Sequence, residues 1–272
     1  MKKTMLRVAL ISSAAMVAGP AAADHWWGGY HWSISGTPLE LDVADAVSSQ
    51  WDSILNTSIN DWSQSQVLNL TKVSGAGVNP KKCSPIAGKI VVCNALYGQR
   101  GWLGIAQIWL SNGHISQATT KVNDTYYNTP TYNTTAWRNL VMCQEIGHDF
   151  GLDHQDENFN NANLNTCMDY TNSPGSNQHP NSHDYAMLEQ IYSHTHTAQT
   201  NFAVREVGKA PPPSGAANEA AGGDSPAEWG RAVQFDGQGR PDVYVQDLGG
   251  GRKKITHVFW AMGEGPNGKH HE

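Results

Sequence analysis

The sequence has little charge, few cysteines and, beyond its first residues, no long hydrophobic run. Charged residues make up 15% of the 272 residues, and the 24 Asp and Glu outnumber the 18 Lys and Arg. This acidic balance argues against nucleic acid or an anionic membrane as a partner. No stretch beyond the N-terminus is long enough to cross a bilayer as a helix, so we expect no membrane anchor. The chain also lacks internal repeats and histidine tracts, which argues against a metal-carrier role.

The N-terminus has the features of an export signal. Basic residues precede an apolar run over residues 8–18, and small residues end at Ala23. We therefore expect a signal peptide at residues 1–23, cleaved near Ala23, and a secreted or periplasmic protein. No cysteine stands at the cut, so a lipid anchor is not indicated. The 249 residues that remain suit one domain with a substantial core and a small appendage.

The four cysteines of an exported chain are expected to form disulfides. None of them has the C-x-x-C spacing of a cysteine zinc site. Cys83 and Cys93 flank a short strand-like segment, and Cys143 and Cys167 lie farther along the chain. Among the three connectivities, we expect the local pairing Cys83–Cys93 with Cys143–Cys167.

Hydrophobic periodicity divides the chain into strands and helices. Period-two alternation predicts strands at residues 39–43 and 66–73, and a hairpin over residues 101–122 with Asn112-Gly113 in its turn. Helical spacing predicts one helix at residues 47–62. A second should start at Thr134 or Thr135 and stop near Gly151, and a last one should be capped by Ser182.

These elements suggest three parts in the mature chain. Residues 24–206 would form the main domain, and residues 207–226, rich in Pro, Ala and Gly, a linker. Residues 227–272 would form a small β appendage with three short strands. Because so few strands are marginally stable alone, we expect them to dock on the main domain.

The most informative segment is the string from Gln144 to His154. It follows the pattern H-E-x-x-H-x-x-G-x-x-H except that glutamine stands at the first position. Residues four apart share a helix face, so Gln144 and His148 should point the same way, and Gly151 should let the chain turn so that His154 returns to them. Two imidazoles and a third donor suit zinc with an open position for water, and Glu145 would be the base for that water.

With these residues in place, the chain resembles the metzincin clan of zinc endopeptidases, particularly bacterial matrixin-like proteins. The string 144–154 carries the resemblance, together with Cys167-Met168-Asp169-Tyr170, which looks like the Met-turn of that clan, and the upstream hairpin. It covers about residues 30–195. The fold class implied is α+β, a zincin-like domain with a twisted mixed sheet, helices above a cleft and the Met-turn.

The resemblance also implies roles for the site residues. His148 and His154 would bind zinc, Glu145 would be the catalytic base, and Met168 would form a hydrophobic floor. A peptide substrate would lie along the hairpin edge near residues 104–108. The resemblance allows a structural calcium ion, for which the sequence shows no site, and no cysteine motif of a latency pro-segment precedes Cys83.

Gln144 departs from the family pattern, and three interpretations stay open. Its side-chain oxygen, a poorer donor than imidazole nitrogen, could bind the metal. Another residue could supply the ligand; Tyr170 matches a tyrosine that astacins and serralysins use, or it could stabilise the transition state. The site could instead have lost zinc. His179 and His183 are weaker candidates, and the pair His194 and His196 is not expected to form a site.

Two functions follow from the sequence. The first is a monomeric, secreted zinc metalloendopeptidase that hydrolyses a peptide or protein by Glu145-assisted attack of water. The second is an inactive protein with a metzincin scaffold that binds a protein or peptide partner. Metal content and hydrolysis would discriminate between them.

Overall fold

The structure, a computed structural model, describes residues 25–193 and 223–266. The expected signal peptide, residues 207–222 of the expected linker, and His194 and His196 lie outside these ranges. Within them, no helix combines the length and the apolar character needed to cross a membrane.

The described strands form one mixed sheet with the order β3-β2-β4-β6-β5-β9-β8-β7, and β1 pairs with β6 off this path. Among these strands, four pairings are parallel and four are antiparallel. The strand bounds are β1 His31–Trp32, β2 Leu39–Ala46, β3 Leu68–Ser74, β4 Lys89–Ala95, β5 Trp102–Ser111, β6 His114–Asn123, β7 Arg231–Phe235, β8 Pro241–Gly249 and β9 Arg252–Trp260.

The two halves of the sheet differ in direction. β2, β3, β4 and β6 are parallel to one another, whereas β5 returns antiparallel to β6 through the turn at Asn112 and Gly113. Both turn residues have positive φ, as the predicted Asn-Gly hairpin requires. On the other side of β5 every pairing is antiparallel. β7, β8 and β9 form a meander, and β9 pairs with β5.

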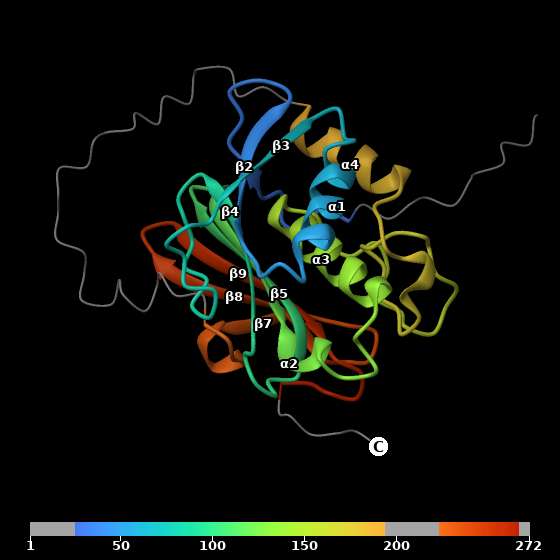
Figure 1. Cartoon of the computed structure of the whole chain (residues 1–272). Coiled ribbons are helices and arrows are strands. Elements are labelled where there is room, and N and C mark those ends of the chain that lie inside the picture. The colour runs from blue at the N-terminus through green and yellow to red at the C-terminus, as the bar shows by residue number, and fades with distance from the viewer. Residues whose placement is uncertain (1–24, 194–222, 267–272) are drawn as a thin grey trace, which may run out of the picture.

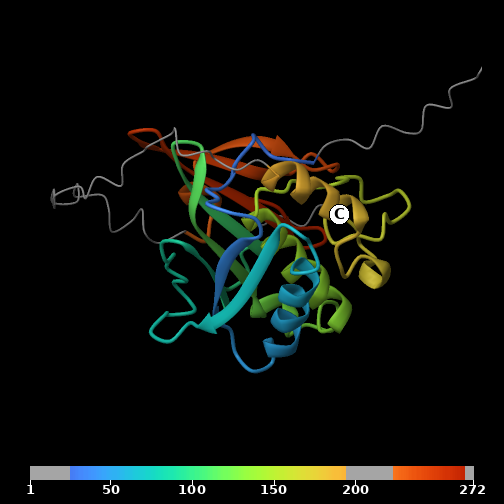
Figure 2. The same ribbon diagram turned by 90° about the horizontal axis from the view of Figure 1, so that it is seen from above.

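The strands expected in the C-terminal appendage are part of this same sheet. β9 is hydrogen-bonded to β5 from Trp102 to Ser111. Figure 2 shows these strands in orange and red on the opposite side of the molecule from β3. The expectation that residues 104–108 offer a free edge to a peptide is therefore wrong for this structure, since β5 has a partner on each side. Local patterns do not reveal which strand fills an edge.

The longer helices lie together on one side of the sheet (Figure 1). Thr134 caps the long helix as predicted, its side chain accepting from the Trp137 amide. The last helix is capped by Asn181 rather than Ser182, because Asn181 forms a reciprocal capping box with Asp184. The helices are α1 Asp52–Trp62, α2 Asp124–Tyr127, α3 Thr135–Asp149 and α4 Ser182–Tyr192, with short 3-10 turns η1 Pro174–Ser176 and η2 Pro226–Glu228.

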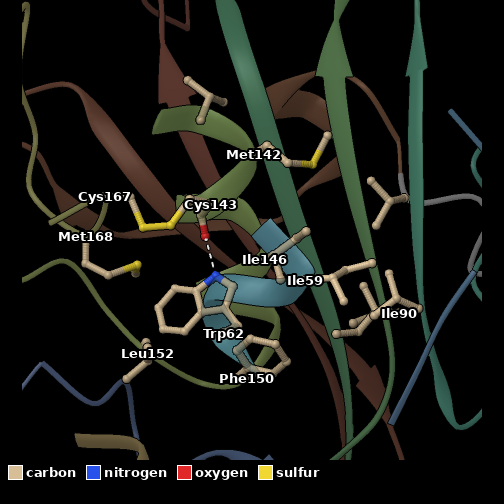
Figure 3. Close-up of a cluster of buried hydrophobic side chains, with 14 of the residues drawn as sticks. Ile59, Trp62, Ile90, Met142, Cys143, Ile146, Phe150, Leu152, Cys167 and Met168 are labelled. Atoms are coloured by element: carbon tan, nitrogen blue, oxygen red, sulfur yellow. Dashed lines mark hydrogen bonds between the residues drawn. A yellow bond between two sulfur atoms is a disulfide. The ribbon is translucent and has the colours of Figure 1, made fainter. Parts of the chain in front are cut away.

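The main core lies between the sheet and the helices α1, α3 and α4. Trp62 is fully buried there, and its indole Nε1 donates to the Cys143 carbonyl at 3.0 Å, as Figure 3 shows. The structure has both predicted disulfides, Cys83–Cys93 and Cys143–Cys167. The second links α3 to the segment that carries Met168. Two disulfides fit an oxidising compartment.

Candidate metal centre

Helix α3 places the first part of the site against the sheet. Its C-terminal half is buried and carries four polar residues, of which Asp149 accepts from Thr120 and three, Gln144, Glu145 and His148, belong to the motif. A helix can bury charged and polar groups on this scale only where they find partners, because an unpartnered buried polar group costs several kcal/mol. The partners of these three residues therefore indicate what the site does.

The turn after α3 brings His154 back to His148. Gly151 has φ +93°, and a Cβ at this position would lie 2.0 Å from the Tyr30 carbonyl oxygen. Only glycine fits there, for both its backbone conformation and its lack of a side chain. The following residue, Leu152, offers its carbonyl to Nδ1 of His148 at 2.9 Å.

His148 and His154 face each other through their Nε2 atoms, which lie 3.1 Å apart. Because a carbonyl only accepts, Nδ1 of His148 carries the hydrogen and its Nε2 keeps a free lone pair. Burial lowers the pKa of His148 well below its usual value, and His257 and His154 lower it further. His148 is therefore a neutral imidazole whose unprotonated Nε2 faces His154.

Three carboxylates surround the other nitrogen of His154. Asp153 and Asp242 lie 3.7 Å from Nδ1, and Glu157 lies 3.8 Å from it. Burial by itself lowers the pKa of His154, but these three acids outweigh it and raise the pKa. Carboxylates behind the far nitrogen of a ligating histidine are common in metal sites, where they orient the ring and raise its basicity. Asp153, His154 and Glu157 also bring one potential ligand atom each to within 4.8 Å of one another.

Glu145 lies between α3 and strand β5. A Cβ on Gly104 would stand 2.5 Å from its Oε1, so the two are in direct contact. Burial raises the pKa of Glu145 well above its usual value, and Asp149 adds to the effect, while the nearby amides of Ala106 and Phe259 oppose it. No side chain among the described residues donates a hydrogen bond to the carboxylate, so these two backbone amides are its polar neighbours. Such a group is suited to accept and return a proton.

Gln144 is anchored by its amide nitrogen rather than free to turn. Nε2 donates to the Cys167 carbonyl at 2.7 Å, next to the disulfide that joins Cys143 and Cys167. Its Oε1 is buried and has no partner within the described part of the chain. The glutamine thus ties α3 to the segment of Met168 and leaves one oxygen atom available.

Met168 contacts α3, and Tyr170 contacts His154. Met168 is buried against Gly147, where a Cβ would be 2.6 Å from its sulfur. The ring of Tyr170 lies 4.1 Å from the ring of His154, and its hydroxyl donates to Asp242 at 3.1 Å. The side chain suggested as an extra ligand is therefore engaged with a carboxylate that also approaches His154.

The structure adds a third imidazole that motif analysis did not select. His257 of β9 stacks on His148 with ring centroids 4.1 Å apart and planes within 10°. Its side chain is 1% exposed. A signal for it exists in the sequence, because alternation along β9 places His257 on the same face as Ile255 and Phe259, both members of the main core. Asp242, Asp153 and Glu157 were likewise missed.

The two histidines named as weaker ligand candidates lie elsewhere. His179 is bonded through Nδ1 to Asp61 at 2.6 Å and is about half exposed. The ring of His183 lies against that of His25, with centroids 4.8 Å apart and planes tilted by 43°. Neither is among the residues that surround His148.

The residues present fit a bound zinc ion. Ligands 2.0–2.1 Å from one tetrahedral zinc have nitrogen atoms about 3.3 Å apart, close to the 3.1 Å between the Nε2 atoms of His148 and His154. Binding to one metal ion would explain why these two imidazoles lie so close together in the buried interior. Oε1 of Gln144, four residues before His148 on the same helix, is buried and has no partner among the described residues, so it is a further candidate donor.

Comparison with known proteins gives distant likenesses in structure alone. No family model and no curated protein matches the chain. Among solved structures, the chain is similar to high choriolytic enzyme 1, a hatching enzyme zinc-protease from Oryzias latipes (medaka fish). The identity is 10% and the TM-score 0.34, over 64% of this chain and 99% of that chain. A likeness at this level supports no inference about activity.

Proposed function

We propose that the protein is an exported zinc metalloendopeptidase of the metzincin, matrixin-like type, with Glu145 as general base and His148 and His154 as zinc ligands. The observation that carries the proposal is the facing pair of Nε2 atoms of His148 and His154 at 3.1 Å, with the buried Glu145 one helical turn before His148. Within the string 144–154, Glu145, His148 and His154 stand at the positions that the zinc-peptidase pattern gives to the base and two ligands.

A bound zinc ion would supply Lewis-acid chemistry, activating a water and polarising the substrate carbonyl. Glu145 would take the proton of the attacking water and return it to the leaving amine, for which its raised pKa in a dry site is suitable. His148, held by the Leu152 carbonyl, keeps one fixed orientation. Gln144 through its free oxygen, and Tyr170, remain the candidates from the motif for a further donor.

The test is the pair of variants Glu145→Gln and Glu145→Ala in the purified mature chain. Hydrolysis of a fluorogenic casein should fall by about 10² to 10⁴, the usual contribution of a general base, while zinc measured by atomic absorption stays stoichiometric. His179→Ala, at a half-exposed histidine, is the control and should change neither quantity. Full hydrolysis in Glu145→Gln would refute the mechanism.

A second candidate is a non-catalytic protein that binds a peptide or protein partner. The observation in its favour is that β9 fills the edge of β5 and that Gln144, Glu145 and His148 are each at most 1% exposed. A protein that carries stoichiometric zinc, or none, and hydrolyses no peptide under any condition would favour this candidate.

A further inference from the structure

His154 needs a hydrogen-bond acceptor on the side that faces away from the proposed metal. A neutral imidazole that binds zinc through Nε2 carries its hydrogen on Nδ1. Nδ1 of His154 is buried and has no hydrogen-bond partner within the described ranges, although three carboxylates lie 3.7–3.8 Å from it. Because a buried N–H without an acceptor is costly, we expect one of these carboxylates to accept it when the metal is bound.

Two of the three carboxylates already accept other hydrogen bonds. The side-chain amide of Gln234 donates to Asp153 at 3.1 Å and to Glu157 at 2.5 Å. This amide has a fixed orientation, because Oε1 of Gln234 accepts from Nε1 of Trp27 at 3.0 Å. Oδ1 of Asp153 also accepts the backbone amide of His154. Both side chains are partly exposed, 18% for Asp153 and 31% for Glu157, so water screens their charges.

Asp242 differs from the other two acids because it is fully buried. Its side chain is 0% exposed, and its Oδ2 lies 3.7 Å from Nδ1 of His154. Its other oxygen, Oδ1, is buried and has no partner in the part of the chain that the structure describes. A carboxylate in such a place destabilises the fold unless it serves a nearby donor, and the Nδ1 hydrogen of His154 is such a donor.

Tyr170 holds this carboxylate in place. Its ring contacts the rings of His154 and Phe159, with centroids 4.1 and 4.8 Å away. Its hydroxyl lies 3.1 Å from Oδ2 of Asp242 and 3.4 Å from the Val258 carbonyl. The hydroxyl has one hydrogen, and the carboxylate is the nearer and stronger acceptor for it.

From these contacts we infer that Asp242 is the positioning residue for His154: its carboxylate accepts the Nδ1 hydrogen, directs Nε2 at the metal, and is itself held by the Tyr170 hydroxyl. The inference rests on the proposed zinc centre and deepens it. Carboxylates in this position orient ligating histidines and raise their basicity. Shortening the contact from 3.7 Å to the about 2.8 Å of a charge-assisted hydrogen bond needs a movement of roughly 1 Å.

The C-terminal strands thereby become part of the metal site. Asp242 is the second residue of β8, and Val243 after it is paired with His257 of β9. The orientation of a ligand that follows α3 therefore depends on a strand from the end of the chain. Tyr170 is assigned to Asp242 and not to the metal, so Gln144 is left as the candidate from the motif for a further donor.

The test measures the zinc affinity of the full mature chain by competition with a chromogenic chelator. Asp242→Asn keeps the size of the side chain but replaces the anionic acceptor, so it should weaken zinc binding about 10- to 100-fold. Asp153→Asn and Glu157→Gln are the matched controls, because each removes one negative charge at nearly the same distance from Nδ1. Each control should lose less affinity than Asp242→Asn. An equal or larger loss in either control would overturn the inference.

Tyr170→Phe removes the hydroxyl that holds Asp242 and should weaken zinc binding by a smaller factor than Asp242→Asn. The double variant should bind zinc about as tightly as Asp242→Asn alone, because the hydroxyl acts through the carboxylate. Losses that multiply in the double variant would overturn the role given to Tyr170 and show that it acts on the metal directly.

Proton NMR of the zinc-loaded wild type gives a readout that needs no substitution. The Nδ1 hydrogen of His154 should show nuclear Overhauser contacts to the methylene group of Asp242. Its resonance, shifted downfield by the carboxylate, should move upfield in Asp242→Asn and stay in place in Glu157→Gln. Contacts to the methylene groups of Glu157 instead would overturn the inference.

Two results separate this inference from the proposed function. If the wild type binds zinc stoichiometrically and Asp242→Asn binds it equally well, only the role of Asp242 is refuted. If the wild type binds no zinc, the zinc centre itself is wrong.

Discussion

Gly104 of β5 lies directly over Glu145 of α3, so that a Cβ on residue 104 would stand 2.5 Å from Oε1 of the carboxylate. The same Cβ would also be 2.5 Å from a methyl of Val141. The strand thus passes over the proposed base with no space between them. Strand and helix can approach this closely only because residue 104 has no side chain.

Gly104→Ala is expected to displace Glu145 while leaving the histidines in place. Overpacking of this kind costs about 1–3 kcal/mol of unfolding free energy, and a displaced base lowers kcat. Zinc affinity should change less than kcat, because the atoms that an added Cβ would meet first belong to Glu145 and Val141 and not to a histidine. Gly36→Ala is the matched control, since a Cβ there meets nothing within 4 Å. A variant with normal kcat would show that the position of Glu145 is not critical.

Gly151→Ala should affect both stability and metal binding. Positive φ costs a non-glycine residue about 1–2 kcal/mol, and here the Cβ also collides with the Tyr30 carbonyl at 2.0 Å. Because Leu152 and His154 follow directly, the displaced turn should misplace both the carbonyl that orients His148 and the second imidazole. We expect a larger fall in Tm than strain alone gives, together with weaker zinc binding.

Gly77→Ala provides the comparison, because Gly77 also has positive φ (+87°), but a Cβ there would meet no atom within 4 Å. It should lose only the strain energy and keep its zinc affinity. If the two variants lose equal stability in urea titrations, the contact with Tyr30 contributes nothing.

Much of the local structure follows from the sequence because its causes are local. Thr134 caps α3 with its own side chain, and the Asn112-Gly113 pair fixes the hairpin turn through its positive φ values. The contact between His148 and His154 is local as well, since Gly151 lies between them. In such cases a few neighbouring residues determine the geometry.

The part that could not be predicted depends on contacts between distant segments. Which strand fills the edge of β5 depends on the whole sheet, and the pairing of Ala106 with His257 spans about 150 residues. Alternation in β9 shows that His257 faces a core, but not which core or which neighbour. The carboxylate of Asp242 reaches His154 by the same route, through β8.

The disulfide Cys143–Cys167 should matter for metal binding as well as for stability. It closes a loop with a sequence separation of 24, for which chain entropy predicts about 3 kcal/mol of stabilisation. It also holds the Cys167 carbonyl at the amide of Gln144, one turn from His148. Replacing both cysteines by serine should therefore lower the unfolding free energy and weaken zinc affinity.

The bridge Cys83–Cys93 is the control, because its separation of 10 predicts a similar loss of stability but it lies in a different buried cluster. Its double serine variant should keep its zinc affinity. Equal zinc affinities for both double variants would show that the Cys143–Cys167 bridge acts on folding alone.

Asp184, at the start of α4, gives the chain a pH-dependent stability. Burial raises the pKa of Asp184 to about 6. Hydrogen bonds from the Thr166 hydroxyl and the Asn181 backbone amide favour the charged form and oppose this rise. His25 approaches its other oxygen at 3.4 Å. A carboxyl whose pKa is raised by folding binds more protons in the folded state between its unfolded pKa of 3.8 and its folded pKa of about 6.

The stabilising contribution of Asp184 is therefore complete below about pH 4 and is lost as the pH rises through 6. A pKa difference of about 2 between the folded and unfolded states corresponds to about 3 kcal/mol over that window. Asp184→Asn keeps an oxygen for Thr166 but cannot ionise, so the difference in unfolding free energy between wild type and variant should change by this amount between pH 4 and pH 7. Urea titrations at several pH values measure it, with the exposed Asp247→Asn as control. A difference that stays constant across the window would mean that Asp184 is ionised with an ordinary pKa in the folded protein.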